Sequence, residues 1–205
     1  MNVEEVSKKL NSASPKQIIN WAISLEGKKI VTTNFGPFES VILHMATQCD
    51  PEIRVVWIDS GYSVKNTYRF AEQLISDFKL NVEVYTPKVT ASRQDTVFGG
   101  VPGIDEPNHK DFTETFKLEP FRRAMEVEKP AVWLTAIRRD QTEFRKNQEI
   151  VSKTASGLIK VAPLLNWTEQ DMRDYVEEHE IPNEENYYDP TKVVGNRECG
   201  LHLEN

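Results

Sequence analysis

Apolar residues follow two different periods along this chain, and the two periods alternate. Segments with apolar side chains at the spacing of an amphipathic helix are separated by short runs of β-branched and aromatic residues, which favour strands. The first helical segment begins with Ser14, a good N-cap, and Pro15 at the first helical position. The last begins with Thr168, which has Asp171 three residues on, as in a capping box. The pattern predicts helices over residues 14–25, 37–48, 65–78, 119–128 and 168–179, and strands over residues 28–34, 53–60, 81–86, 131–137 and 157–165.

The alternation of strand and helix predicts an α/β domain with a mainly parallel sheet and right-handed crossovers. Residues 53–60 form a nearly continuous apolar run, which is typical of a strand buried on both faces of a parallel sheet. Residues 87–111 are rich in Gly, Pro and Asp and show little periodicity. In a compact domain, such a stretch predicts a functional loop or lid.

Composition and charge limit the number of domains, the cellular location and the classes of ligand that we expect. The 205 residues, 39% hydrophobic and 28% charged, suit one globular domain, alone or with a small lobe. No apolar run approaches the length of a membrane span, and the polar residues 1–10 lack the core of a secretion signal, so we expect a cytoplasmic protein. Cys49 and Cys199 are then expected to be free thiols, with Cys49 a small buried residue of a helix. The net charge of −7 argues against general nucleic-acid binding.

Two segments at predicted strand ends are candidates for ligand binding, because ligands of such sheets bind outside the carboxyl ends of the strands. Residues 32–40 link a strand to a helix with Gly36 in the turn, so their backbone N–H groups and hydroxyls could be directed at a phosphate. A plain strand-to-helix turn explains this pattern equally well. Residues 59–62 follow the most hydrophobic strand, and a tight turn is again the alternative interpretation.

A third candidate segment, residues 136–147, concentrates positive charge after a predicted buried strand. It contains Arg138, Arg139, Arg145 and Lys146, although the chain is acidic as a whole. Arginine side chains match phosphate or sulfate oxygens in a bidentate manner. For any single residue a solvated helix start is the simpler interpretation, but the cluster at a strand end favours a pocket for an anion.

The chain also places a cysteine close to its last residue, within residues 197–202, Arg-Glu-Cys-Gly-Leu-His. Chain ends are usually poorly ordered. Cys199 is therefore badly placed for a structural role and well placed for a thiol that meets a substrate and then withdraws. Arg197 and His202 beside it favour the reactive thiolate. The alternative is a disordered tail with a chance cysteine.

The chain resembles the phosphoadenylyl-sulfate (PAPS) reductases of sulfate assimilation and cysteine biosynthesis over nearly its whole length. The resemblance rests on TTNFG, DSGY, TYRF, KLEPFRRAM, RRDQTEFR, KVAPLLNWT and RECGLH, in that order. It implies an adenine nucleotide α-hydrolase-like fold of the PP-loop type, with three layers and a mainly parallel sheet. It also implies a single domain over residues 1–205, of which residues 190–205 form a mobile catalytic tail.

The resemblance further implies a reaction and assigns roles in it. Cys199 attacks the sulfur of PAPS and releases adenosine 3',5'-bisphosphate, and thioredoxin or glutaredoxin discharges the S-sulfocysteine as sulfite. His202 contacts the substrate anion, residues 32–36 match a modified phosphate loop, and residues 59–61 match the region that approaches adenine and ribose. The expected substrate-binding residues are Thr32, Thr33, Asn34, Phe35, Gly36, Asp59, Ser60, Gly61, Lys117, Arg138, Arg139, Arg145 and Arg197.

Departures from the relatives bear on the function. Relatives that reduce adenylyl sulfate with a [4Fe–4S] cluster carry cysteine pairs that are absent here, which implies a cluster-free, thioredoxin-dependent enzyme without a metal. The segment before RECGLH is shorter than in the relatives, which puts tail closure and turnover in question. Residues 32–36 lack the SGGxDS pattern of ATP pyrophosphatases, which argues against an ATP-dependent sulfurtransferase or nucleotidyltransferase. A nucleotide-binding protein without turnover is the other alternative, and a homodimer is compatible with the sequence.

Overall fold

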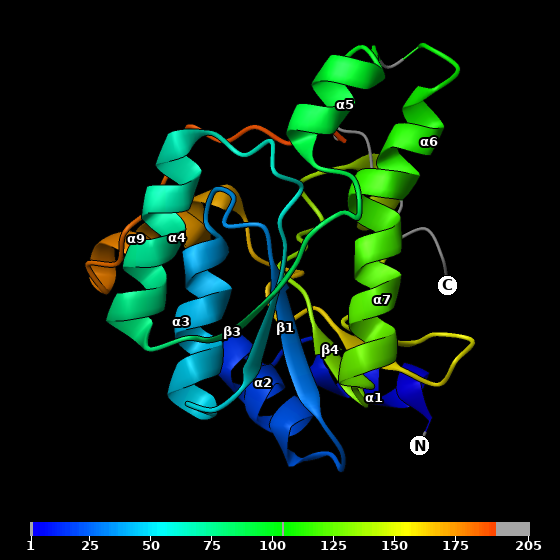
Figure 1. Ribbon diagram of the computed structural model, residues 1–205. Coiled ribbons are helices and arrows are strands. Elements are labelled where there is room, and N and C mark those ends of the chain that lie inside the picture. Colours follow the sequence, from blue (N-terminus) through cyan, green and yellow to red (C-terminus); the bar gives the residue numbers. More distant parts are fainter. Residues whose placement is uncertain (1, 104, 192–205) are drawn as a thin grey trace.

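A mainly parallel sheet forms the centre of the computed structural model, which describes residues 2–103 and 105–191 (Figure 1). Within these residues the sheet has six strands in the order β3-β2-β1-β4-β6-β5. Every neighbouring pair is parallel except β5 with β6, which confirms the predicted sheet. The strands are β1 (Lys29–Thr33), β2 (Arg54–Ile58), β3 (Asn81–Tyr85), β4 (Val132–Leu134), β5 (Val151–Lys153) and β6 (Ile159–Val161).

The predicted helices are present, and their caps explain where two of them begin. Ser14 caps α2 in a capping box with Gln17, and Thr168 caps α9 in a capping box with Asp171. None of the helices in the described part of the chain combines the length and apolar composition that a membrane span requires. The helices are α1 (Val3–Leu10), α2 (Pro15–Ser24), α3 (Glu39–Cys49), α4 (Lys65–Phe78), α5 (Ala91–Val97), α6 (His109–Thr113), the π-helical turn Glu114–Leu118, α7 (Glu119–Glu128), α8 (Glu143–Lys146) and α9 (Glu169–Glu178).

Alternate residues of the central strands face two separate cores, one on each side of the sheet. Val31 and Val55 belong to the larger core, which they share with apolar residues of α2, α3, α4 and α9. Ile30 and Val56 point the other way, into a smaller core covered by α7. Because side chains alternate between the faces of a sheet, strands that are apolar at consecutive positions hold helices on both faces. The result is a three-layer arrangement, with α3 and α4 on one side and α7 on the other (Figure 1).

Some elements differ from those that the sequence pattern predicts. Residues 87–111, predicted as a loop, contain α5 and the start of α6. Helix α5 buries none of its side chains, so it leaves no apolar periodicity to detect. Helix α1 and strand β5 were not expected, and they support one another: the Ser7 hydroxyl donates to Glu149 Oε2 at 2.8 Å and accepts from the backbone N–H of Val151 at 3.3 Å.

A buried carboxylate joins α7 to the first three strands. Glu128 at the end of α7 is 7% exposed, forms an ion pair with Lys28, and accepts a hydrogen bond of 2.8 Å from the Tyr85 hydroxyl. Arg54 Nε lies 3.7 Å from the same carboxylate. Burial alone would raise the pKa of Glu128, but the hydrogen bonds from Lys28 and Tyr85 and the charges of Lys28 and Arg54 outweigh it, so the pKa is lowered.

Glu128→Gln is expected to lower the free energy of unfolding at neutral pH by about 1–3 kcal/mol, because a charged acceptor of buried hydrogen bonds is lost. A lowered pKa in the folded state stabilises the protein above the unfolded-state pKa of about 4.3, and this contribution is lost as the pH falls through the folded value. The difference between the two proteins should therefore shrink below about pH 4. Urea unfolding across this range measures it, with Glu126→Gln, an exposed carboxyl of the same helix, as the control. A difference that stays constant with pH would contradict the assignment.

Candidate functional site

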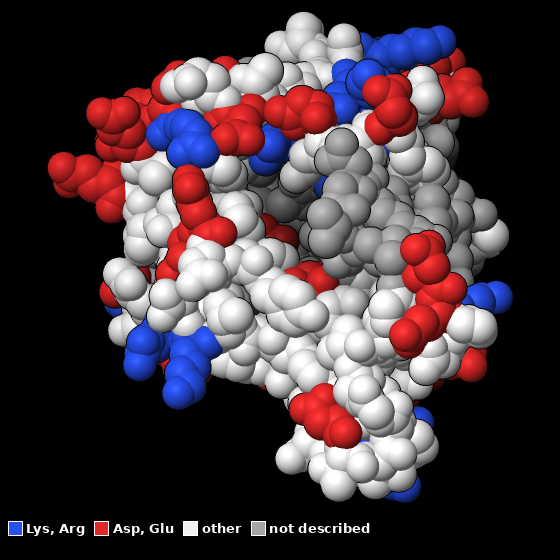
Figure 2. Space-filling view, turned by 90° about the horizontal axis from the view of Figure 1, so that it is seen from above, with Lys and Arg blue, Asp and Glu red and all other residues white. Residues whose placement is uncertain are grey.

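A cavity with a volume of about 320 Å³ lies at the carboxyl ends of β1 and β4. From β1 the chain first builds the sheet outward through β2 and β3, and β4 then pairs with the other edge of β1. The order of the strands therefore reverses between β1 and β4, which is where open α/β sheets bind ligands. The molecule is hollowed at this end, and acidic and basic side chains both lie around the hollow (Figure 2).

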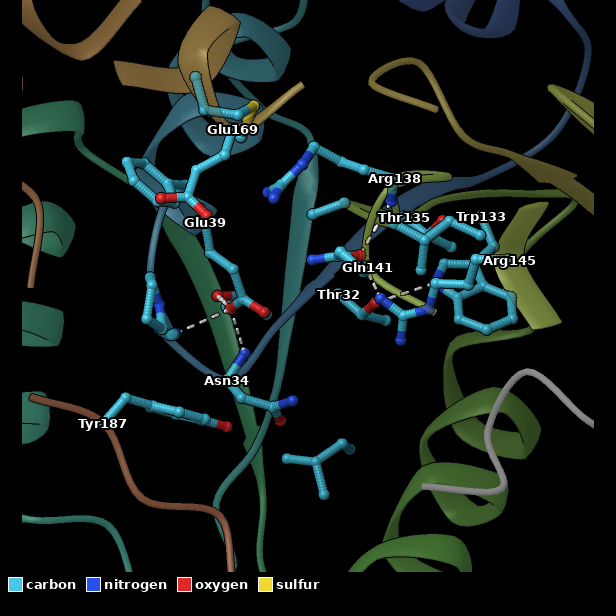
Figure 3. Close-up of a pocket in the computed structure, with 18 of the residues that line it drawn as sticks. Thr32, Asn34, Glu39, Trp133, Thr135, Arg138, Gln141, Arg145, Glu169 and Tyr187 are labelled. Carbon is cyan, nitrogen blue, oxygen red and sulfur yellow. Dashed lines mark hydrogen bonds between the residues drawn. The ribbon is translucent and has the colours of Figure 1, made fainter. Parts of the chain in front are cut away.

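The loop after β1 turns its donors toward a carboxylate of the same chain. Glu39 Oε2 accepts hydrogen bonds from the Thr33 hydroxyl at 2.7 Å, from the Asn34 backbone N–H at 2.7 Å and from the Gly36 backbone N–H at 3.1 Å (Figure 3). Phe35, at a positive φ of 53°, is fully buried against Trp57 and serves the core. Three of the donors that the sequence assigns to a phosphate are thus already engaged by Glu39.

Two almost buried arginines line the cavity. Arg138 is 6% exposed and Arg145 is 9% exposed. Arg138 Nε donates to Asp140 Oδ1 at 3.0 Å, and the Arg145 guanidinium donates to the side chain of Gln141, a bond visible in Figure 3. Charged groups removed from water are strong ligands for anions, because little solvent screens them. These arginines form the cationic part of the site.

Arg139 and Lys146, from the same predicted cluster, lie apart from this cationic part. Among the described residues that line the cavity, neither is included. The Arg139 guanidinium donates to the Asn166 side chain and, at 3.1 Å, to the carbonyl of Gln148. Lys146 forms an exposed ion pair with Glu143. The cluster in the sequence therefore divides between the cavity and the surface.

Lys117 lies in a smaller adjoining cavity, where it is paired with a carboxylate. Lys117 and Asp189 form an ion pair whose side chains are 4% and 7% exposed. Asp189 also accepts hydrogen bonds from the backbone N–H of Thr191 at 3.0 Å and from its hydroxyl at 2.6 Å. The predicted anion-binding amine is thus held by the segment that leads toward the C-terminus.

The predicted adenine and ribose segment forms a tight turn beside this smaller cavity. Asp59 Oδ1 accepts hydrogen bonds of 2.8 Å from the Gly61 backbone N–H and the Tyr68 hydroxyl. Gly61 has a positive φ of 77°, a conformation that favours glycine. Ser60 lines the smaller cavity, whereas Asp59 and Gly61 line neither cavity among the described residues. The structure therefore brings Ser60, but not Asp59, to the site.

Several cavity residues were missed by the sequence analysis. Trp133 donates from its indole N–H to the Thr32 hydroxyl at 2.9 Å and lies in the wall of the cavity with Thr135. The ring of Tyr187 lies so close to Gly36 that a Cβ at residue 36 would be 3.4 Å from it. An acidic residue in the first turn of a predicted helix was a usable signal for Glu39, whereas no local pattern connects residue 187 with residue 36.

Of the two cysteines, the structure describes Cys49 but not Cys199. Cys199, His202 and Arg197 lie outside the described residues, as does most of the proposed tail, residues 190–205. Cys49 ends α3 and is half-buried against the larger core, and burial raises the pKa of its thiol. A raised pKa reduces the thiolate fraction, so Cys49 is a poor nucleophile. No group of at least three His, Cys, Asp or Glu side chains in the described part of the chain could hold a metal ion.

Asp189→Ala is expected to lower the free energy of unfolding by about 3 kcal/mol, because it leaves the buried Lys117 charge without its carboxylate. The matched control is Glu114→Ala, which removes one partner of the exposed Arg122–Glu114 pair and should cost less than about 1 kcal/mol. Urea unfolding of the three proteins measures both effects. Equal losses in the two variants would show that the Lys117–Asp189 pair is not buried in solution.

Comparisons with known proteins agree over nearly the whole chain. The family model of the phosphoadenosine phosphosulfate reductase domain matches residues 28–201. A phosphoadenosine 5'-phosphosulfate reductase of Synechococcus sp. is 31% identical over 98% of this chain and 97% of its own length, and one of Vibrio campbellii is 31% identical over 98% and 86%.

Solved structures show the same fold. The PAPS reductase of Candida auris, in a phosphate complex, is similar with a TM-score of 0.78 and 24% identity, covering 89% of this chain and 88% of its own. The FMN adenylyltransferase of Candida glabrata is similar with a TM-score of 0.58 and 15% identity, covering 82% and 56%. These likenesses confirm the adenine nucleotide α-hydrolase-like fold.

Proposed function

Because this chain belongs to the phosphoadenosine phosphosulfate reductase family, we propose that it reduces 3'-phosphoadenylyl sulfate to sulfite and releases adenosine 3',5'-bisphosphate. The observation that carries the proposal is the pair of almost buried arginines, Arg138 and Arg145, that line the cavity at the reversal of strand order. A substrate with a phosphosulfate group needs such cations. The wall formed by Ile58, Phe121 and Trp133 supplies apolar surface for a nucleoside.

The arginines have a further role in the bond-breaking step. When the sulfo group leaves the nucleotide, the S–O bond breaks and its electron pair stays on the phosphate oxygen of the leaving group. Arg138 and Arg145 are held by Asp140 and Gln141 before substrate arrives, so little reorganisation is needed to meet this charge. Fixed donors directed at a developing charge lower the barrier of a reaction.

The attacking group in this proposal is Cys199, with Arg197 and His202 as the neighbouring cations. Its thiolate attacks the sulfur of PAPS and becomes an S-sulfocysteine. A thiolate of thioredoxin or glutaredoxin then attacks the Cys199 Sγ, expels sulfite and forms a mixed disulfide with Cys199. The second thiol of the reductant attacks this mixed disulfide and releases the Cys199 thiolate. The reductant is left as a disulfide, which accounts for the two electrons consumed. This proposal includes a single domain, residues 1–205, with residues 190–205 as a mobile catalytic tail.

The number of thiols supports a cluster-free mechanism. The chain has two cysteines, fewer than the four thiolates of a cysteine-ligated [4Fe–4S] cluster. In this proposal the electrons for the reduction come from a dithiol reductant. The adjoining residues Ser60 and Lys117 complete the proposed substrate site, and Lys117 has to exchange Asp189 for the substrate anion.

Arg138→Ala is expected to weaken binding of adenosine 3',5'-bisphosphate and of PAPS by about tenfold to a hundredfold, because one charge-assisted hydrogen bond to an anion is lost. Arg139→Ala is the matched control, since this neighbouring guanidinium faces Asn166 and Gln148. Calorimetric titration of both variants tests the assignment. If Arg138→Ala binds both nucleotides as the parent protein does, the anion lies elsewhere.

Cys199→Ser tests the nucleophile. Mixing the parent protein with PAPS in the absence of a reductant should leave one sulfonate on the C-terminal peptide, and reduced thioredoxin should discharge it as sulfite. Cys199→Ser should bind nucleotide and form no adduct, because a serine hydroxyl with no adjacent base is a weak nucleophile at neutral pH. Mass spectrometry of the peptides identifies the modified residue.

The control for this experiment is Cys49→Ser, which should form the adduct as the parent protein does. A sulfonate on Cys49, or none on either cysteine while adenosine 3',5'-bisphosphate binds, would contradict the Cys199 mechanism. The second of these results would favour a nucleotide-binding protein without turnover.

A further inference from the structure

We propose that Glu39 is a specificity-determining residue, whose carboxylate fills the anion-binding turn after β1 and excludes phosphate groups from it. The anion-binding turn is defined here as the Thr33 hydroxyl with the backbone N–H groups of Asn34 and Gly36. The groups excluded from the turn are the phosphates of inorganic pyrophosphate and of nucleotides with a longer phosphate chain, such as ATP. The proposal deepens the proposed function, since it concerns which anions the same cavity admits.

The geometry of the turn is that of an occupied anion site. Its three donors converge on one oxygen, Glu39 Oε2, at 2.7, 2.7 and 3.1 Å. Backbone N–H groups of one turn that are directed at a single point form a concavity that binds anions. Helix α3 begins at Glu39, so the positive end of its dipole adds to the attraction. A carboxylate of the chain therefore occupies the position that a phosphate oxygen would take.

The backbone around the turn is fixed independently of any ligand. Phe35 and Phe38 both have positive φ, and both side chains are buried. The Thr33 hydroxyl accepts from the Phe35 backbone N–H at 2.9 Å while donating to Glu39, and Asn183 Oδ1 accepts from the Phe38 backbone N–H at 2.8 Å. The donors thus keep their direction when the Glu39 side chain is replaced.

Occupation by Glu39 gives the cavity two electrically different sides. The arginine side, at Arg138 and Arg145, carries positive charge. The turn carries the negative charge of Glu39, and its donors are satisfied. A second anion there would lose its hydrogen-bond partners and meet a like charge. An anion is therefore admitted on the arginine side only.

Glu39→Ala is the direct test, with inorganic pyrophosphate and ATP as the probes. Removing the carboxylate opens three donors, so the variant should bind pyrophosphate at least about tenfold more tightly than the parent protein. Glu169→Ala is the matched control, because Glu169 also lines the cavity but donates nothing to and accepts nothing from the turn. Glu169→Ala removes a negative charge from the same cavity without opening the turn. Calorimetric titration of the three proteins therefore separates the effect of freeing the donors of the turn from the effect of removing a negative charge.

The outcomes are distinct. A gain in Glu39→Ala well above that of Glu169→Ala supports the proposal, and equal gains overturn it. A parent protein that fails to bind adenosine 3',5'-bisphosphate would defeat the proposed function, while the pyrophosphate comparison would still report on Glu39.

A measurement on the parent protein keeps the proposal testable if Glu39→Ala does not fold. Pyrophosphate should leave the amide resonances of Asn34 and Gly36 unchanged at concentrations that shift the Arg138 Nε–H resonance, because the turn is occupied. Amide shifts of Asn34 and Gly36 at those concentrations would overturn the proposal.

Discussion

A charge or a fixed donor taken out of water needs a partner, since desolvation otherwise costs several kcal/mol. At the carboxyl edge of this sheet the chain meets that requirement with its own carboxylates. Glu39 holds the donors of the turn after β1, Asp140 holds Arg138, and Asp189 holds Lys117. The position of each of these groups follows from the pairing, and so does the shape of the cavity between them.

The same pairing defines what a substrate has to do on entering. An anion that reaches Lys117 competes with Asp189, so binding there is an exchange of one anion for another. One contact of the Arg145 guanidinium is with a neutral group, because it donates to the side chain of Gln141. Asp189 is ten residues before Cys199 in the sequence, so the exchange at Lys117 acts on the segment that leads to the proposed nucleophile.

The sequence predicts most of the regular structure because local signals fix it. The caps at Ser14 and Thr168, and the apolar run of β2, mark their elements without reference to the rest of the chain. Helix α5 was missed because it buries no side chain. Strand β5 was missed because its three residues depend on Ser7, which is 144 residues away from Val151.

Some residues of the site were likewise predicted from local signals, whereas others depend on contacts between distant parts of the chain. The arginine cluster after β4 was visible as a charge pattern, but the pattern could not show that Arg138 enters the cavity while Arg139 turns to Asn166. The pairings of Lys117 with Asp189 and of Gly36 with Tyr187 join segments far apart in the sequence. Such contacts depend on the folded chain and leave no local period.

The fold by itself does not specify the chemistry, because one architecture of this kind supports several unrelated reactions. The groups that would specify the chemistry here lie in the segments that follow β1 and β4. Glu39 occupies a turn that would otherwise bind phosphate, and the buried positive charges of the cavity are those of Arg138 and Arg145. The position of these arginines, rather than the net charge of −7, then decides where an anionic substrate can bind, because charges buried in the cavity are screened less than those on the surface.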